Sequence, residues 1–92
     1  MSNSELLVKV KELLDKDKAP EAKSLFVRIN PDDSVEYYLV KGKLEQKFQN
    51  WGEAINAYSK VLELDSGNLE AANNLNLIED ILNYWNTDMF NP

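Results

Sequence analysis

The sequence predicts an all-α domain built from five antiparallel helices. Apolar residues recur at spacings of three and four in five successive segments, as in amphipathic helices, and no segment shows the alternation of a strand. The connections span about 3 to 5 residues, which is too short to return the chain to the same end of a helix. With 92 residues, the chain is long enough for one domain with one modest core.

The first two helices are predicted over residues 4–16 and from about Pro20 to Ile29. One face of the first helix carries Leu6, Leu7, Val10, Leu13 and Leu14. Proline suits the first position of a helix, and Asn30-Pro31 ends the second helix. The two segments are therefore expected to form a helical hairpin.

The third and fourth helices are predicted over residues 33–48 and about 51–64. Each opens on a residue pair of the capping-box type, and the pairs are Asp33 with Glu36 and Asn50 with Glu53. Gly67 follows the fourth helix, at the place where a left-handed residue would be needed to end it. These two helices are expected to form a second hairpin.

The fifth helix is predicted over residues 69–84, with Asn68 as its N-cap. Three aromatic residues, Tyr84, Trp85 and Phe90, crowd the end of the chain. The tail over residues 85–92 is expected either to fold back over the open end of the helices or to bind a partner or a second copy. In the first case, Trp85, Met89 and Phe90 would cover Ile78, Ile81 and Leu82.

An internal repeat relates the two predicted hairpins. Ala22 and Phe26 match Ala54 and Tyr58 at a separation of 32 residues (54 − 22 and 58 − 26). The second copy reads Tyr38-x2-Lys41-Gly42-x2-Glu45, then Ala54-x3-Tyr58, then Leu64-Asp65-Ser66. It resembles the tetratricopeptide repeat, whose pattern is W-x2-L-G-x2-Y, then A-x3-F, then P. The sequence departs from that pattern at Lys41, Glu45 and Ser66.

The resemblance implies a right-handed solenoid of helical hairpins with about two and a half repeats. Its parts would be a degenerate repeat over 4–31, the best-matching repeat over 33–66, a capping helix over 68–84 and a tail over 85–92. In the second hairpin, Gly42 and Ala54 would lie where the helices approach closely, and Tyr58 would fill the space beneath.

The resemblance also implies a concave groove lined by the first helix of each hairpin. The residues expected to point into it are Leu7, Lys11, Leu14, Leu39, Lys43, Gln46, Asn73, Leu77 and Asp80. Because two lysines would flank an apolar stripe, ligands with acidic groups should be preferred. The alternative is that Leu7, Leu39 and Leu77 are ordinary helix-packing residues and that the lysines are solvated.

Some members of the family grip a terminal carboxylate of a peptide with basic and amide side chains. The corresponding places hold Leu7, Lys11, Val40, Glu70 and Asn74. Only Lys11 matches, and Glu70 would repel a carboxylate. The resemblance therefore disfavours this mode of binding.

Composition excludes several classes of chemistry. The chain has neither Cys nor His, which excludes a disulfide framework, a thiolate nucleophile, a typical zinc site and a His-based triad. The formal net charge of −6 argues against binding to nucleic acid or to an anionic membrane. Three isolated glycines cannot build a phosphate-binding loop. The acidic pairs Asp32-Asp33 and Glu79-Asp80 are interpreted as caps and solvated surface.

The sequence therefore predicts a non-catalytic module that binds a protein or peptide and carries no cofactor or metal. We expect a soluble protein, because no signal-like or membrane-spanning segment occurs in the sequence. As an isolated domain it is expected to be a monomer. The cytoplasm is the favoured compartment, although the lack of Cys leaves this open. Two alternatives remain: a structural or capping segment of a larger multidomain protein, and an enzyme that uses Lys, Tyr, Asp and Glu.

Overall fold

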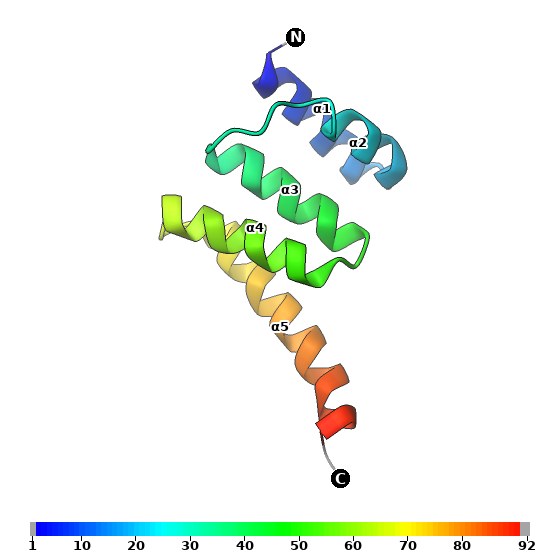
Figure 1. Ribbon diagram of the computed structural model, residues 1–92, viewed down its shortest axis with the longest axis vertical. Coiled ribbons are helices and arrows are strands. Elements are labelled where there is room, and N and C mark those ends of the chain that lie inside the picture. The colour runs from blue at the N-terminus through cyan, green and yellow to red at the C-terminus, as the bar shows by residue number, and fades with distance from the viewer. Residues whose placement is uncertain (1, 91–92) are drawn as a thin grey trace.

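The computed structural model describes the backbone of residues 2–90 and the side chains of residues 2–84. This part of the chain contains five helices and no strand, so the predicted all-α class is confirmed. The helices are α1 (Asn3–Asp15), α2 (Ala19–Phe26), α3 (Val35–Lys47), α4 (Trp51–Leu64) and α5 (Leu69–Phe90), shown in Figure 1.

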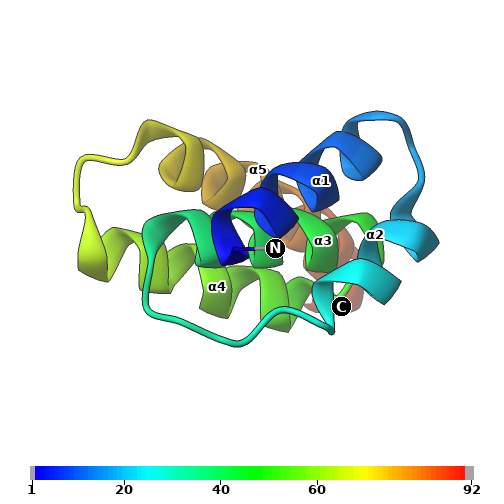
Figure 2. The same cartoon turned by 90° about the horizontal axis from the view of Figure 1, so that it is seen from above.

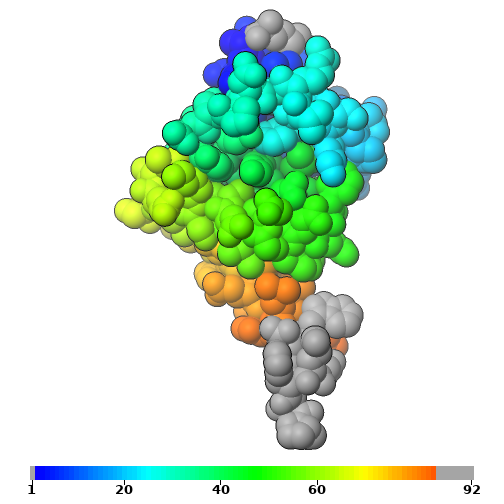
Figure 3. Space-filling model, viewed as in Figure 1, coloured from blue at the N-terminus to red at the C-terminus, as the bar shows by residue number. Residues whose placement is uncertain are grey.

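The helices pack mainly against their neighbours in the chain. α1 packs on α2, α3 on α4 and α4 on α5, while α3 also contacts both α1 and α2. Viewed from above, the α1–α2 hairpin lies over the α3–α4 hairpin (Figure 2). The space-filling view shows α5 extending beyond the body that the other four helices form (Figure 3). α3 is therefore the central helix, because it joins the two hairpins.

The N-termini of α1 and α3 are capped in the same way, 32 residues apart. The Ser2 hydroxyl oxygen accepts a hydrogen bond of 3.3 Å from the backbone N–H of Glu5. The Ser34 hydroxyl oxygen accepts one of 3.0 Å from the N–H of Tyr37. Each bond satisfies one of the amide groups that a helix N-terminus leaves without an internal partner. Ser34 therefore caps α3, one residue after the predicted cap at Asp33.

The C-termini of α1 and α3 also share one geometry. Both helices have 13 residues, and each is followed by a left-handed residue that is not glycine. These residues are Asp17 and Gln49, each with φ of 60°. Beyond them, the N–H of Lys18 donates to the Leu13 carbonyl and the N–H of Asn50 donates to the Glu45 carbonyl, at 2.8 and 2.9 Å. This bonding satisfies carbonyl groups that the last helical turn exposes.

The second helices of the two hairpins differ in length. α2 has 8 residues and α4 has 14. α2 ends at Phe26, before the predicted end at Ile29, and Ile29 is nevertheless buried in the core. A turn after Phe26 brings it there, because the N–H of Ile29 donates to the Phe26 carbonyl at 2.9 Å.

Two predicted helix signals are wrong. Gly67 does not have a positive φ. A left-handed residue is not needed there, because α4 ends at Leu64 and its C-cap, Asp65, already leaves the helical conformation with φ of −147° and ψ of 88°. The Asn50 side chain does not cap α4 and instead donates to a Glu45 carboxylate oxygen at 3.1 Å.

The start of α5 agrees with the sequence prediction, and its end does not. The Asn68 side-chain oxygen accepts a 2.9 Å hydrogen bond from the N–H of Ala71, as expected of an N-cap. The helix continues to Phe90, although the lost apolar periodicity predicted an end near residue 84. The predicted fold-back of Trp85, Met89 and Phe90 concerns side chains outside the described residues.

Among the side chains that the structure describes, two groups of buried residues form the core. The first joins α1, α2 and α3, and the second joins α4 and α5. Tyr38 packs against both groups and so connects them. In the first group, the rings of Phe26 and Tyr37 stack with centroids 5.1 Å apart.

The closest approach between α3 and α4 lies at Gly42. A Cβ atom at this position would lie 2.7 to 2.9 Å from three ring carbons of Tyr58. Cβ atoms in proteins essentially never come this close to another heavy atom. Tyr58 is fully buried. Glycine at position 42 is therefore required by the Tyr58 ring. Ala54, the expected neighbour of Gly42, is fully buried as well, but the nearest atoms belong to Tyr58.

We expect Gly42→Ala to lower the free energy of unfolding by about 1–3 kcal/mol, because the Tyr58 ring has no room to move. Gly52→Ala is the matched control, since nothing lies within 4 Å of a Cβ at that helical position. The control should leave stability unchanged or raise it by up to about 1 kcal/mol. Urea unfolding followed by circular dichroism measures both changes. Equal effects of the two substitutions would contradict the close contact.

We expect Gln49→Gly to raise the free energy of unfolding by about 0.5–1 kcal/mol. Glycine relieves the cost of about 1–2 kcal/mol for a left-handed residue, and part of this gain is offset by its greater freedom in the unfolded chain. Gln49→Val should be destabilising, because a β-branched residue adopts this conformation with difficulty. If glycine and valine changed stability in the same direction, the left-handed assignment would be wrong.

Candidate functional site

A groove with a volume of about 230 Å³ lies between α1, α3 and the first turn of α5. It is lined by Ser4, Leu7, Val8, Lys11, Glu36, Leu39, Val40, Lys43 and Glu70. Four of the nine residues predicted to share a groove meet here: Leu7, Lys11, Leu39 and Lys43. We refer to this feature as the α1–α3 groove.

The two long walls of the α1–α3 groove come from matching positions of the internal repeat. Each residue on α1 has a counterpart on α3 that lies 32 positions later in the chain. The pairs are Ser4 with Glu36, Leu7 with Leu39, Val8 with Val40, and Lys11 with Lys43. Glu70 stands two residues after the cap of α5, as Ser4 and Glu36 stand two residues after theirs. The groove is thus built from equivalent faces of α1, α3 and α5.

The floor of the α1–α3 groove is apolar and continuous with the core. Leu7 and Val40 are buried, Leu39 is half-buried, and Val8 on the rim is 57% exposed. The sequence left open whether Leu7 packs between helices or lines a groove. It does both, because it belongs to the first core group and also lines the α1–α3 groove. Binding of an apolar side chain here would be favourable, because it removes apolar surface from water.

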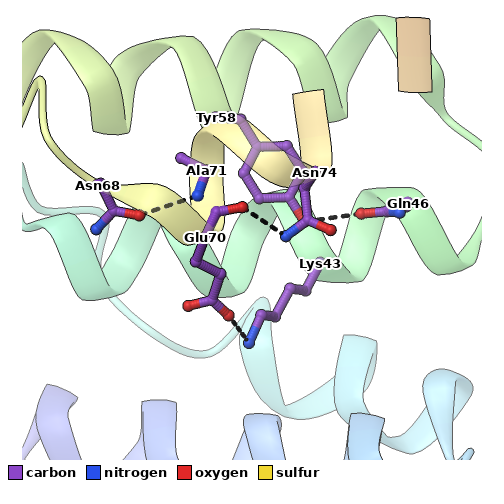
Figure 4. Close-up of polar contacts among 7 residues, drawn as sticks. All are labelled: Lys43, Gln46, Tyr58, Asn68, Glu70, Ala71 and Asn74. Atoms are coloured by element: carbon purple, nitrogen blue, oxygen red, sulfur yellow. Dashed lines mark hydrogen bonds and ion pairs between the residues drawn. The ribbon is translucent and has the colours of Figure 1, made fainter. Parts of the chain in front are cut away.

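The charges of the α1–α3 groove are two lysines and two glutamates. Lys43 on α3 forms an ion pair with Glu70 on α5 across one end of the groove (Figure 4). Their side chains are 26% and 42% exposed. Lys11 is exposed and forms no ion pair among the described residues. Among the described residues, Lys11 on α1 and Glu36 on α3 are therefore the groove charges without an ion-pair partner.

The first turn of α5 holds Glu70 at its place. Asn68 caps this turn through Ala71, and the Asn74 side-chain amide donates to the Glu70 carbonyl at 3.0 Å. Figure 4 shows the Glu70 carboxylate pointing away from these bonds and toward Lys43. The ion pair consequently ties α5 to α3, in addition to the packing of α5 on α4.

Leu14 and Gln46 lie outside the α1–α3 groove. They line a second, open hollow of about 540 Å³ near the C-terminal ends of α1 and α3. Its lining residues are Leu14, Asp15, Lys43, Gln46, Lys47, Gln49 and Trp51. Lys43 borders both hollows. The two hollows are therefore neighbours along α3.

Gln46 has a structural role besides its place in the second hollow. Its side-chain oxygen accepts a hydrogen bond of 2.8 Å from the Tyr58 hydroxyl (Figure 4). Burial raises the pKa of the Tyr58 phenol, and the charge of Glu70 raises that pKa further. The phenol thus stays protonated and donates to Gln46.

The predicted groove residues on α5 lie apart from the α1–α3 groove. Asn73, Leu77 and Asp80 are exposed and line neither hollow, and Leu77 is 49% exposed. α5 extends away from α1 and α3, so only its first turn reaches the groove (Figure 1).

The sequence prediction missed Ser4, Val8, Glu36, Val40 and Glu70 as lining residues. Helical spacing contains the necessary signal, because residues three, four and seven positions before a given residue share its face. Applied to Lys11 and Lys43, this rule selects all four missed residues on α1 and α3. Glu70 was considered only as a residue that repels a terminal carboxylate.

The acidic pair Asp32-Asp33 is part of the α2–α3 connection. Asp32 accepts hydrogen bonds from the N–H of Ser34 at 2.8 Å and from the Asn3 side chain at 3.3 Å. Hydrogen bonding from the Ser34 side chain and then from its backbone N–H, with a smaller effect of Asn3, lowers the pKa of the Asp32 carboxyl. Among the described residues, no group of three or more acidic side chains is arranged to hold a metal ion.

Comparison with known proteins adds no family assignment. No family model, curated protein or solved structure matches the chain. Within the part of the chain that the structure describes, no helix is long and apolar enough to cross a membrane.

We expect the stability of the protein to fall above about pH 10, the ordinary pKa of tyrosine, because Tyr58 and Tyr37 lose their protons more readily when unfolded. A raised folded pKa means that this stability is present below pH 10 and lost above it. For Tyr58, the loss reaches at most about 1.4 kcal/mol per pH unit between its unfolded and folded pKa.

Tyr58→Phe tests this expectation. The variant should lose less stability than the wild type between pH 10 and 11.5, measured by urea unfolding at each pH. The two proteins differ only in this hydroxyl group, so any other effect of pH is common to both. Identical pH profiles would show that Tyr58 does not couple its ionisation to folding.

Proposed function

We propose that the chain is a non-catalytic interaction module that binds a segment of a protein or peptide in the α1–α3 groove. The observation that carries this proposal is the groove itself, with an apolar floor at Leu7, Leu39 and Val40 and charges of both signs on its rim. Apolar floors with a few placed charges are typical of surfaces that bind peptides.

We also propose that the fold is a tetratricopeptide-like solenoid of about two and a half repeats. Three features support this proposal. α1 and α3 both have a serine N-cap, both are followed by a left-handed residue, and the walls of the groove come from matching positions of the repeat. In this view, α5 is the first helix of an incomplete third repeat. Repeats of this kind contact only their neighbours and present a concave surface to ligands.

A second candidate function is that of a structural segment within a longer chain. Leu69 and Leu77 on α5 are exposed although both are large and apolar. Such residues would be buried if a further helix packed on α5. This candidate places the partner on α5, whereas the first places it between α1 and α3.

A matched pair of substitutions tests the proposed binding site. Peptides selected from a random displayed library on the purified domain provide the ligand. Val8→Glu places a charge on the groove rim and should weaken binding of these peptides at least tenfold, since burying a charge against apolar atoms is costly. Val27→Glu, the same change at a valine that is 70% exposed and outside the groove, should leave binding unchanged.

Fluorescence anisotropy with labelled peptides measures both affinities, and circular dichroism checks that both variants fold. Equal affinities of the two variants would place the binding surface elsewhere. Loss of binding on changing Leu77 to Glu, with Val8→Glu unaffected, would favour the structural candidate on α5.

A further inference from the structure

The Lys43–Glu70 ion pair shows that a carboxylate fits at one end of the α1–α3 groove. Glu70 reaches Lys43 from the first turn of α5, and both side chains line the groove. Both are partly exposed, and ion pairs of this kind contribute little to stability. A second carboxylate could therefore replace Glu70 on Lys43 without disrupting the fold.

The surroundings of Lys43 define what such a carboxylate would belong to. Leu39 and Val40 precede Lys43 on the same face of α3 and form part of the apolar floor. Lys11, at the matching place on α1, is without an ion-pair partner among the described residues. An apolar side chain on the floor would therefore lie beside two ammonium groups.

We propose that the α1–α3 groove takes a segment in which a carboxylate side chain neighbours an apolar side chain, and that this carboxylate displaces Glu70 from Lys43. The proposal rests on the proposed peptide-binding function and names the chemistry of its ligand. Glu70 then acts as an internal competitor for Lys43. It lowers the affinity for acidic segments and has little effect on the affinity for uncharged segments. The attraction for the carboxylate comes from Lys11 and Lys43, whereas Glu36 in the same groove and the net charge of −6 of the chain oppose it.

The test uses two capped peptides that differ in one group. They are acetyl-Ala-Leu-Asp-Leu-Ala-amide and its Asn counterpart, so neither has a terminal carboxylate and only the first has a charged side chain. Binding is followed from the NMR shifts of the Leu7, Val8 and Leu39 methyl groups. We expect the Asp peptide to bind the wild type about twofold to fivefold more tightly, the range expected for an exposed ion pair.

Glu70→Gln is the decisive variant, because it frees Lys43 while keeping the size of the side chain. It should tighten binding of the Asp peptide by a further twofold to fivefold, roughly, and leave the Asn peptide unchanged. Lys43→Gln should reduce the preference for the Asp peptide. Glu63→Gln is the matched control, since it removes the Lys60–Glu63 ion pair on α4, away from the groove. It should affect neither peptide.

Each other outcome has one meaning. If both peptides shift the groove methyl groups with equal affinity in the wild type and in Glu70→Gln, the groove binds apolar segments and the role of Glu70 is wrong. If the Asp peptide is preferred but Glu70→Gln has no effect, the acid binds elsewhere and displacement is wrong. If neither peptide shifts these methyl groups in any variant, the peptide-binding function fails together with this proposal.

Discussion

The contact between Gly42 and the Tyr58 ring sets the geometry on which the rest of the structure depends. The ring carbons occupy the space where any Cβ at position 42 would lie, so α3 and α4 can pack as they do only with glycine there. The phenol hydroxyl then needs a partner, because Tyr58 is fully buried, and Gln46 supplies it one turn along α3. This single side chain fixes both the distance and the register between the two helices.

The position of α4 in turn decides what closes the α1–α3 groove. α5 packs on α4 through Ala71 and Ile78, and this packing brings the first turn of α5 near α3. Glu70 reaches Lys43 only because α5 starts at that point. Because α4, α3 and α5 meet closely here, burial raises the pKa of Tyr58 and the charge of Glu70 raises it further. The packing of α3 on α4 at Gly42 therefore also determines where Glu70 lies in the groove.

Local signals in the sequence predicted the number and order of the helices, and the resemblance to the repeat predicted the close approach at Gly42 with Tyr58 beneath it. Five of the nine residues that line the α1–α3 groove were not predicted. Caps such as Asn68 act over three residues, so a short motif is sufficient to place a helix start. Gln49 was missed because a non-glycine residue can adopt a left-handed conformation at modest cost, and no residue type then marks it. The end of α5 was placed too early because apolar periodicity is lost before the helical hydrogen bonding ends. Of the groove residues on α1 and α3, the resemblance to the repeat predicted Leu7, Lys11, Leu39 and Lys43 but missed Ser4, Val8, Glu36 and Val40. Placing Asn73, Leu77 and Asp80 required the direction of α5, which depends on packing against α4.

The charges within the groove and the net charge of the chain act differently on an acidic ligand. The chain carries a net charge of −6, while the groove holds two lysines and two glutamates. At physiological ionic strength charges are screened beyond about 8 Å, so an acidic segment is repelled weakly on approach and interacts with Lys11 and Lys43 only once it lies in the groove. Long-range charge mainly changes the rate of association, and contacts within the site mainly change the rate of dissociation. For a segment of the proposed chemistry, slow association would thus accompany whatever affinity the two lysines provide, and added salt would speed association while weakening the bound state.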